Sequence, residues 1–174
     1  MRVLFLFLLT ANVCISQPNV ETEKSVLSID NYVKSVANLT LDAAFEINKR
    51  VSNKAALLEK KVTISLLDAS GTIILMSRAD GVGPHNTEAA RRKAYTALST
   101  KTATLSLLRT AAINPDTKNL NTLPELLLLS GGVPIWYNGN IIGSIGVAGG
   151  GSPENDDLIA RSAAIPELGI TTTK

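Results

Sequence analysis

His85 is the only histidine in the 174-residue chain, so any imidazole chemistry depends on this one side chain. It stands in the stretch "GVGPH", directly before residues that predict a helix. Functional side chains concentrate in such connecting segments, where they project outward and not into a core. A neutral imidazole can ligate a haem iron without a second histidine. The residue types leave three interpretations open: a surface or turn residue without chemistry, the ligand of a bound group, or a catalytic acid/base.

Charged side chains flank His85 on both sides and complete a candidate ligand-binding set. Asp80 precedes "GVG" and could face a pocket, although one carboxylate does not form an acid–base pair. The run Arg91, Arg92 and Lys93 predicts a solvated helix face. The alternative is that Arg91 or Arg92 contacts a ligand carboxylate such as a propionate, since guanidinium groups bind carboxylates in a bidentate way.

Several other chemistries lack the residues that they need. The one cysteine, Cys14, lies in the apolar leader, and a single histidine excludes a multi-histidine metal site within one subunit. A Ser-His-Asp hydrolase would need a nucleophile elbow, which the sequence lacks. The glycine-rich stretch "GVAGGGSPENDD" precedes a predicted helix but contains no phosphate-loop lysine. Its acidic residues would repel a phosphate and instead suit the positive end of a helix dipole.

The first residues, "MRVLFLFLLTANVCIS", predict a secretory signal peptide over residues 1–16. One positive charge precedes a short apolar run, and a small residue, Ser16, stands at the cleavage position. Its removal would take Arg2 and Cys14, lower the formal charge of +2 by one and leave no cysteine. We expect a secreted protein, extracellular or periplasmic, with no membrane attachment after cleavage. The low charge and the 4% of aromatic residues do not favour nucleic-acid binding.

The first half of the chain predicts a helix, a hairpin and a second helix. Helical spacing runs over residues 22–58, with Ser28 or Asp30 as the cap and a break near residues 52–53. Two β-rich runs, residues 61–67 and 72–78, flank the turn "DASG". A second helix follows, capped by Asn86 or Thr87, and its alanines would let it lie close on a sheet.

The second half predicts strands followed by a closing helix. Residues 111–124 predict a polar connection, and residues 125–148 predict three strands separated by "SGG" and "NGN" turns. The closing helix has Ser152 as its cap and Pro153 at its first position, with Leu158, Ile159 and Ala163 facing inward. The order α-ββ-α-βββ-α predicts an α+β fold with an antiparallel five-stranded sheet flanked by helices. We expect residues 17–174 to form a single domain.

Three stretches carry a resemblance to a known family: "DASGTIILMSRADG", "ARRKAYTA" and "GGVPI…IGSIGVAGG" with a later aspartate. Together they resemble the GlcG/HbpS family of haem-binding, or haem-degrading, domains, which is related to the C-terminal domain of PduO proteins. The resemblance covers roughly residues 27–165. The structural motif of the family matches this chain at Gly131, Gly132, Pro134, Gly143, Gly146, Gly149 and Asp157.

The resemblance implies a layered, profilin/PAS-like fold, a homo-oligomer and haem binding in some members. The longer polar segment "NKRVSNKAALLEKK" and the hairpin "IWYNGN" depart from the family pattern. We therefore expect a secreted protein that binds haem or another tetrapyrrole, with His85 as candidate iron ligand and a role in haem or iron handling. Two alternatives stay open: an enzyme acting on haem or a small organic acid, and a structural oligomer without small-molecule chemistry.

Overall fold

A computed structural model describes residues 28–174. The chain divides into two compact units, Met1–Lys34 and Ser35–Lys174. In the first unit the described residues hold one short 3-10 helix, η1 (Ile29–Asn31). The expected signal peptide, residues 1–16, lies outside the described residues, and a single domain over residues 17–174 stays a prediction. None of the helices within residues 28–174 has the length and apolar character needed to span a membrane.

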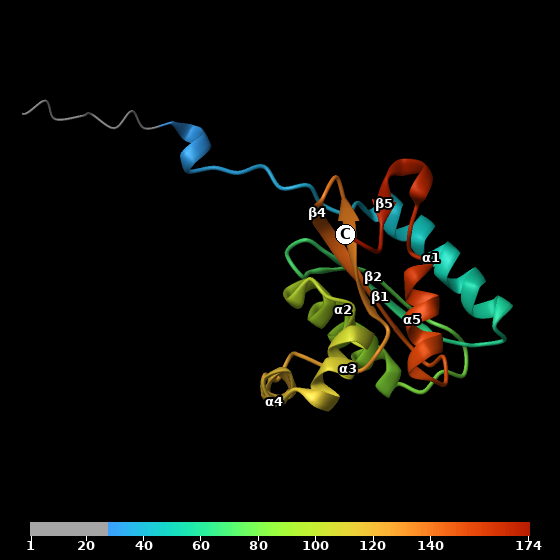
Figure 1. Cartoon of the computed structure of the whole chain (residues 1–174). Helices are drawn as coiled ribbons and strands as arrows, with labels where there is room; N and C mark the ends of the chain where they lie inside the picture. The colour runs from blue at the N-terminus through green and yellow to red at the C-terminus, as the bar shows by residue number, and fades with distance from the viewer. Residues whose placement is uncertain (1–27) are drawn as a thin grey trace, which may run out of the picture. The chain divides into compact units, whose positions relative to one another are not determined.

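The second unit is built on a five-stranded antiparallel sheet with the strand order β2-β1-β4-β3-β5. Figure 1 labels β1, β2, β4 and β5. The strands are β1 (Thr63–Asp68), β2 (Ile73–Arg78), β3 (Gly132–Tyr137), β4 (Asn140–Ala148) and β5 (Ile170–Thr171). This confirms the predicted α+β class and sheet. One strand lies elsewhere than predicted, because residues 125–129 form no strand and the fifth strand is the C-terminal β5.

Two of the three predicted turns between strands, "DASG" and "NGN", are present. The prediction that "SGG" is a turn between two strands is wrong, because residues 125–129 form no strand. The Asp68 carboxylate accepts hydrogen bonds from the backbone N–H groups of Ser70 and Thr72, each 2.9 Å long, and thereby closes the β1–β2 turn. Asn138 and Gly139 both have positive φ angles, 48° and 73°, which is the conformation of a type I′ turn between β3 and β4. These local signals fix two of the strand pairings from sequence.

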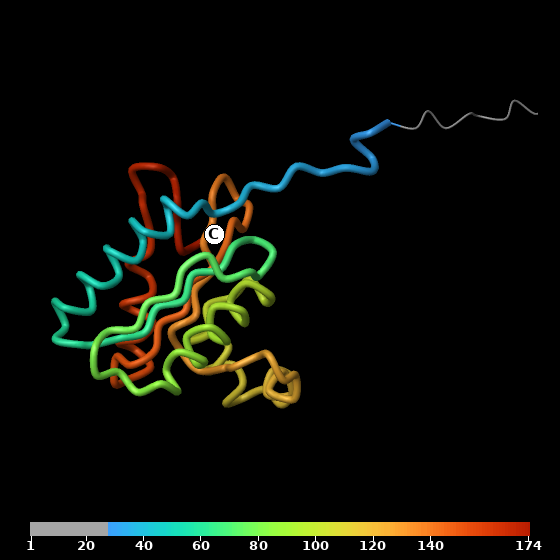
Figure 2. The backbone as a smooth tube through the Cα atoms, turned by 180° about the vertical axis from the view of Figure 1, so that it is seen from behind, coloured from blue at the N-terminus to red at the C-terminus, as the bar shows by residue number. Residues whose placement is uncertain are grey.

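Helices cover both faces of the sheet, as the two opposite views show (Figures 1 and 2). On one face α1 (Leu41–Leu57) and α5 (Pro153–Arg161) form the main hydrophobic core with alternate residues of β1, β3 and β4. Ile159 and Ala163 are fully buried there, as predicted, whereas Leu158 is 46% exposed and the prediction that it faces inward is wrong.

Helix α1 begins later than predicted. Its cap is Thr40, whose hydroxyl accepts a hydrogen bond from the N–H of Ala43, and not Ser28 or Asp30. Just before this cap, the Leu39 N–H donates a hydrogen bond of 2.8 Å to the backbone oxygen of Ile142 in β4. The helix then continues without the predicted break at residues 52–53.

Helix α2 (His85–Thr100) covers the opposite face of the sheet. Its buried Ala90, Ala94 and Ala97 allow the close approach that the sequence predicted. Its start differs from the prediction: Pro84 is the cap, and neither Asn86 nor Thr87 caps it. The predicted polar connection is largely helical. It contains the end of α3 (Thr104–Ile113), then α4 (Pro115–Lys118) and η2 (Asn119–Thr122); η3 (Pro166–Leu168) precedes β5.

Candidate functional site

A pocket of about 410 Å³ lies where the start of α2 meets the loop before α5. His85, the first residue of α2, lies in its wall with an exposed side chain. Four apolar residues, Ala89, Leu108, Leu129 and Pro153, also line it. The remaining lining residues are Asn86, Lys93, Ser130, Gly149, Gly151, Ser152 and Asp156. Six of the twelve lining residues carry polar or charged side chains, although most of the exposed lining surface is apolar. A concave surface that is largely apolar by area can receive a small molecule.

The imidazole of His85 lies against Gly83 in the preceding loop. A Cβ atom on Gly83 would come within 2.9 Å of His85 Cε1, which is closer than Cβ atoms approach in real proteins, and within 3.0 Å of Nδ1, which is unusually tight. A glycine at this position therefore leaves the space that the ring occupies. The "GVGPH" stretch thus leaves room for the imidazole in this position and leads directly into the helix.

Lys93 lies in the same pocket, two helical turns beyond His85, and is only 4% exposed. Its ammonium group donates hydrogen bonds to Asp156 Oδ2 (2.8 Å) and to the backbone oxygen of Val147 (2.9 Å). The prediction of a solvated face over residues 91–93 is wrong for Lys93. Asp156 was expected to act only on the helix dipole, but it is the buried partner of this lysine.

The two arginines of the predicted ligand set are engaged away from the pocket. Arg91 forms ion pairs with Glu88 (2.7 Å) and Glu125 (2.8 Å). The hydrogen bond to Glu88 is the main reason that the pKa of Arg91 is raised above its ordinary value. Arg92 donates to the backbone oxygens of Pro124 and Leu126, each over 2.8 Å. The structure thus gives both guanidinium groups partners within the chain.

The pocket therefore brings together only part of the predicted ligand set. His85 and Lys93 line it, whereas Asp80 is exposed and, like Arg91 and Arg92, is absent from its lining. Sequence reasoning missed Asp156 as a pocket residue and missed Leu108 and Leu129 as walls. Leu129 was missed because its apolar run predicts a strand. Asp156 was missed because an acidic residue in the first turn of a helix is already explained by the helix dipole.

The predicted glycine motif lies in β3, β4 and the loops beside them. Side chains at Gly132 and Gly146 would overlap the backbone of α2, and one at Gly143 would overlap the backbone of β1. Gly149, with a φ of 113°, lies in the pocket wall. Pro134 lies within β3, and Asp157 forms an ion pair with Arg161 (2.6 Å). The motif thus serves close packing of the sheet, with one member reaching the pocket.

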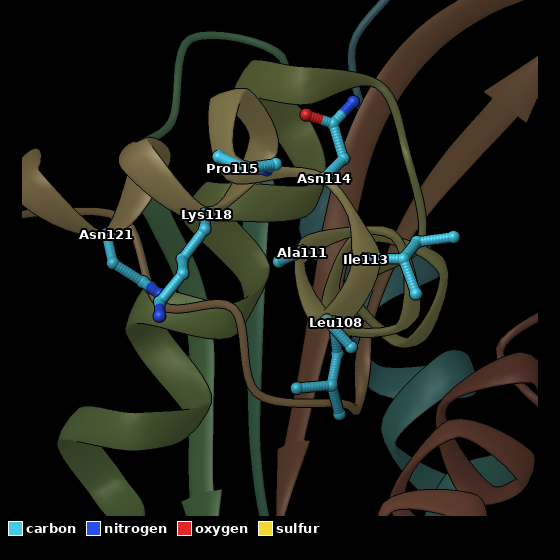
Figure 3. Close-up of a pocket in the computed structure, with 8 residues that line it drawn as sticks. Leu108, Ala111, Ile113, Asn114, Pro115, Lys118 and Asn121 are labelled. Atoms are coloured by element: carbon cyan, nitrogen blue, oxygen red, sulfur yellow. The ribbon is translucent and has the colours of Figure 1, made fainter.

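A second pocket, of about 490 Å³, lies between α3 and the residues that follow it (Figure 3). Leu108 lines both pockets. The side chains of Lys118 and Asn121 converge at one end of this second pocket (Figure 3). Neither histidine nor carboxylate lines it. Within residues 28–174, no three His, Cys, Asp or Glu side chains are grouped so as to hold a metal ion.

Comparison with known proteins places this arrangement in a family. A sequence model described as "Haem degrading protein HbpS-like" matches residues 39–165. An uncharacterised 15.0 kDa protein from the dhaT-dhaS intergenic region of Citrobacter freundii is 31% identical over 137 residues, covering 76% of this chain and 94% of that protein. The corrinoid adenosyltransferase PduO of the same species is 30% identical over 130 residues, or 72% of this chain, which correspond to only 38% of the length of PduO.

Solved structures agree with the sequence matches. A double mutant of HbpS from Streptomyces reticuli is 28% identical and has a TM-score of 0.70, over 89% of this chain and 95% of that one. PduOC in complex with haem is 29% identical and has a TM-score of 0.68, over 80% of this chain and all of PduOC. The layered fold, the glycine motif and the match over residues 39–165 show that the chain belongs to the HbpS-like family.

Proposed function

We propose that this protein binds haem in the pocket of about 410 Å³, where the imidazole of His85 would hold the iron. The observation that carries the proposal is that the only histidine of the chain lines a pocket together with four apolar residues, beside a glycine that leaves room for its ring. The family assignment and the haem complex of the related PduOC support the choice of ligand.

The residues present fit the chemistry of a haem group. A bound haem supplies an iron that takes a nitrogen ligand, and the imidazole of His85 would hold it. The side chains of Ala89, Leu108, Leu129 and Pro153 would cover the apolar part of the macrocycle and exclude water. Because the imidazole is exposed, its coordination would not require it to leave a buried position.

Haemin titration of the wild-type protein and of His85→Ala tests this proposal. We expect a Soret shift with a one-to-one end point in the wild type. We expect the ligation signature to be lost in His85→Ala and restored by added imidazole. Thr87→Ala, two residues along the same helix and outside the pocket lining, is the matched control and should behave as the wild type. A wild type without a Soret shift would contradict haem binding, and an unchanged spectrum of His85→Ala would contradict ligation.

A second candidate function is haem breakdown, which the description of the matching family favours. Incubation with haemin, a reductant and oxygen separates an enzyme from a carrier. Catalase is added to remove peroxide formed by free haemin. Pigment loss that continues over many equivalents with release of product would favour the enzyme, whereas a stable Soret band would favour the carrier.

We also propose that the protein is exported, acts in haem or iron handling, and works as a homo-oligomer. The apolar leader with its small-residue cleavage position supports export. Intact-mass measurement of protein recovered from outside the cytoplasm should give a chain that begins at Gln17. Light scattering during size-exclusion chromatography should give a mass well above one subunit; a monomer mass would contradict assembly.

A further inference from the structure

The buried ion pair between Lys93 and Asp156 connects the two sides of the pocket. Lys93 belongs to α2, the helix that begins with His85, and Asp156 belongs to the first turn of α5. Both side chains are almost fully buried, at 5% and 12% exposure, and their charged atoms are 2.8 Å apart. The pair therefore links the histidine-bearing helix to the opposite wall.

Asp156 also holds the glycine-rich wall itself. Its Oδ1 accepts a hydrogen bond of 2.7 Å from the N–H of Gly150, while Oδ2 accepts from Lys93. The amide of the neighbouring Asn155 donates to the carbonyl of Gly150 over 2.9 Å. Lys93 in turn donates to Val147, near the end of β4 where this loop begins. Both backbone groups of Gly150 and the start of the loop are thus held by one connected set of bonds.

Two glycines make room for this carboxylate. A Cβ atom on Gly150 would lie 2.6 Å from Asp156 Oδ1, and one on Gly131 would lie 2.8 Å from Asp156 Cβ. Side chains at these positions would push the carboxylate away from the lysine. The glycine-rich stretch is therefore matched to the ion pair and not to a phosphate.

We propose that Lys93 and Asp156 are positioning residues that hold the glycine loop, residues 149–152, at a fixed place opposite His85. The inference rests on the proposed haem site for its effect on ligand binding, but its effect on the loop is independent of any ligand. Because the two charges neutralise each other, the pair shapes the pocket without adding a net charge to it.

The test uses the full-length chain and the double variant Lys93→Met/Asp156→Leu. Replacing both members avoids an unpaired buried charge, which would destabilise the fold on its own. We expect thermal unfolding close to that of the wild type. Hydrogen exchange at the Gly150 amide should accelerate about tenfold or more, because its charged acceptor is lost. Haemin affinity should weaken by about tenfold, because the glycine loop in the pocket wall is then less ordered. Lys93→Met/Asp156→Asn leaves no unpaired charge and keeps an acceptor for Gly150, so its Gly150 amide should exchange more slowly than that of Lys93→Met/Asp156→Leu.

Asp157→Asn is the matched control, since the neighbouring residue on the same helix forms an ion pair with Arg161 and does not line the pocket. It should leave Gly150 exchange and haemin affinity unchanged. A folded double variant with wild-type exchange at Gly150 would overturn the proposal. If the wild type binds no haemin, the haem site fails, while the exchange measurement still decides whether the pair holds the loop. Faster exchange with unchanged haemin affinity would overturn the link to the ligand.

Discussion

Gly146 of β4 lies so close to Ala90 of α2 that a Cβ atom on the glycine would overlap the Ala90 carbonyl oxygen. The obstacle is backbone, which cannot move aside as a flexible side chain would. We expect Gly146→Ala to lower the free energy of unfolding by about 3 kcal/mol or to prevent folding. Gly139→Ala, at an open turn with positive φ, should cost only about 1 kcal/mol. Urea unfolding measures both, and equal losses would contradict close packing at Gly146.

Gly83→Ala should change ligand binding without unfolding the protein. The added methyl group would collide with the imidazole of His85, and Gly83 does not have a positive φ that would make alanine strained. We expect the ring to rotate away and haemin affinity to fall by about tenfold or more. Circular dichroism should remain as in the wild type. Unchanged affinity and ligation spectrum would show that the ring orientation is unimportant.

Esterification of the haem propionates should have little effect on affinity. The charged groups of the pocket, Lys93 and Asp156, neutralise each other, and Arg91 and Arg92 are engaged elsewhere. We expect haemin and its dimethyl ester to bind with dissociation constants within about tenfold of each other. Parallel titrations in the same solvent provide the measurement. A loss of about a hundredfold or more for the ester would mean that a cation of this chain binds the carboxylates.

The ion pair of Arg91 with Glu88 should contribute a small, pH-dependent stability. The hydrogen bond from Arg91 lowers the pKa of Glu88 below its ordinary value. A folded-state pKa below the unfolded value gives stability that is present above about pH 4.3 and is lost as the pH falls through the folded pKa. Since both groups are partly exposed, we expect Arg91→Met to cost about 0.5 kcal/mol at pH 7.

The measurement is urea unfolding of the wild type and Arg91→Met at pH 7 and pH 3. The difference between the two proteins should be smaller at pH 3 than at pH 7, because the ion pair is lost as the pH falls toward and through the lowered pKa of Glu88. A constant difference at both pH values would mean that the arginine acts through packing of its stem and not through its charge.

The sequence was most informative where a short motif determines geometry. "NG" predicted the turn at Asn138–Gly139, and Ser152–Pro153 predicted the start of α5, because both depend on backbone preferences of the residues themselves. Prediction from the sequence failed where contacts between residues far apart in the chain determine the structure. Apolar residues 125–129 predict a strand, yet the edge of β3 is paired with residues 170–171. Lys93 resembles a solvent-facing lysine until Asp156, far along the chain, is placed beside it.

The position of β1 between β2 and β4 has a consequence for how the chain is made. Thr63 pairs with Ala148, and Asp68 with Gly143, so β1 meets its second neighbour only after most of the chain has left the ribosome. Until β4 has been synthesised, the β1–β2 hairpin lacks its neighbouring strand. Pairing between strands that are far apart in the sequence, such as β1 and β4, also forms slowly. For a protein that we propose is exported, this delay would keep the nascent chain unfolded long enough to be threaded through a translocation channel.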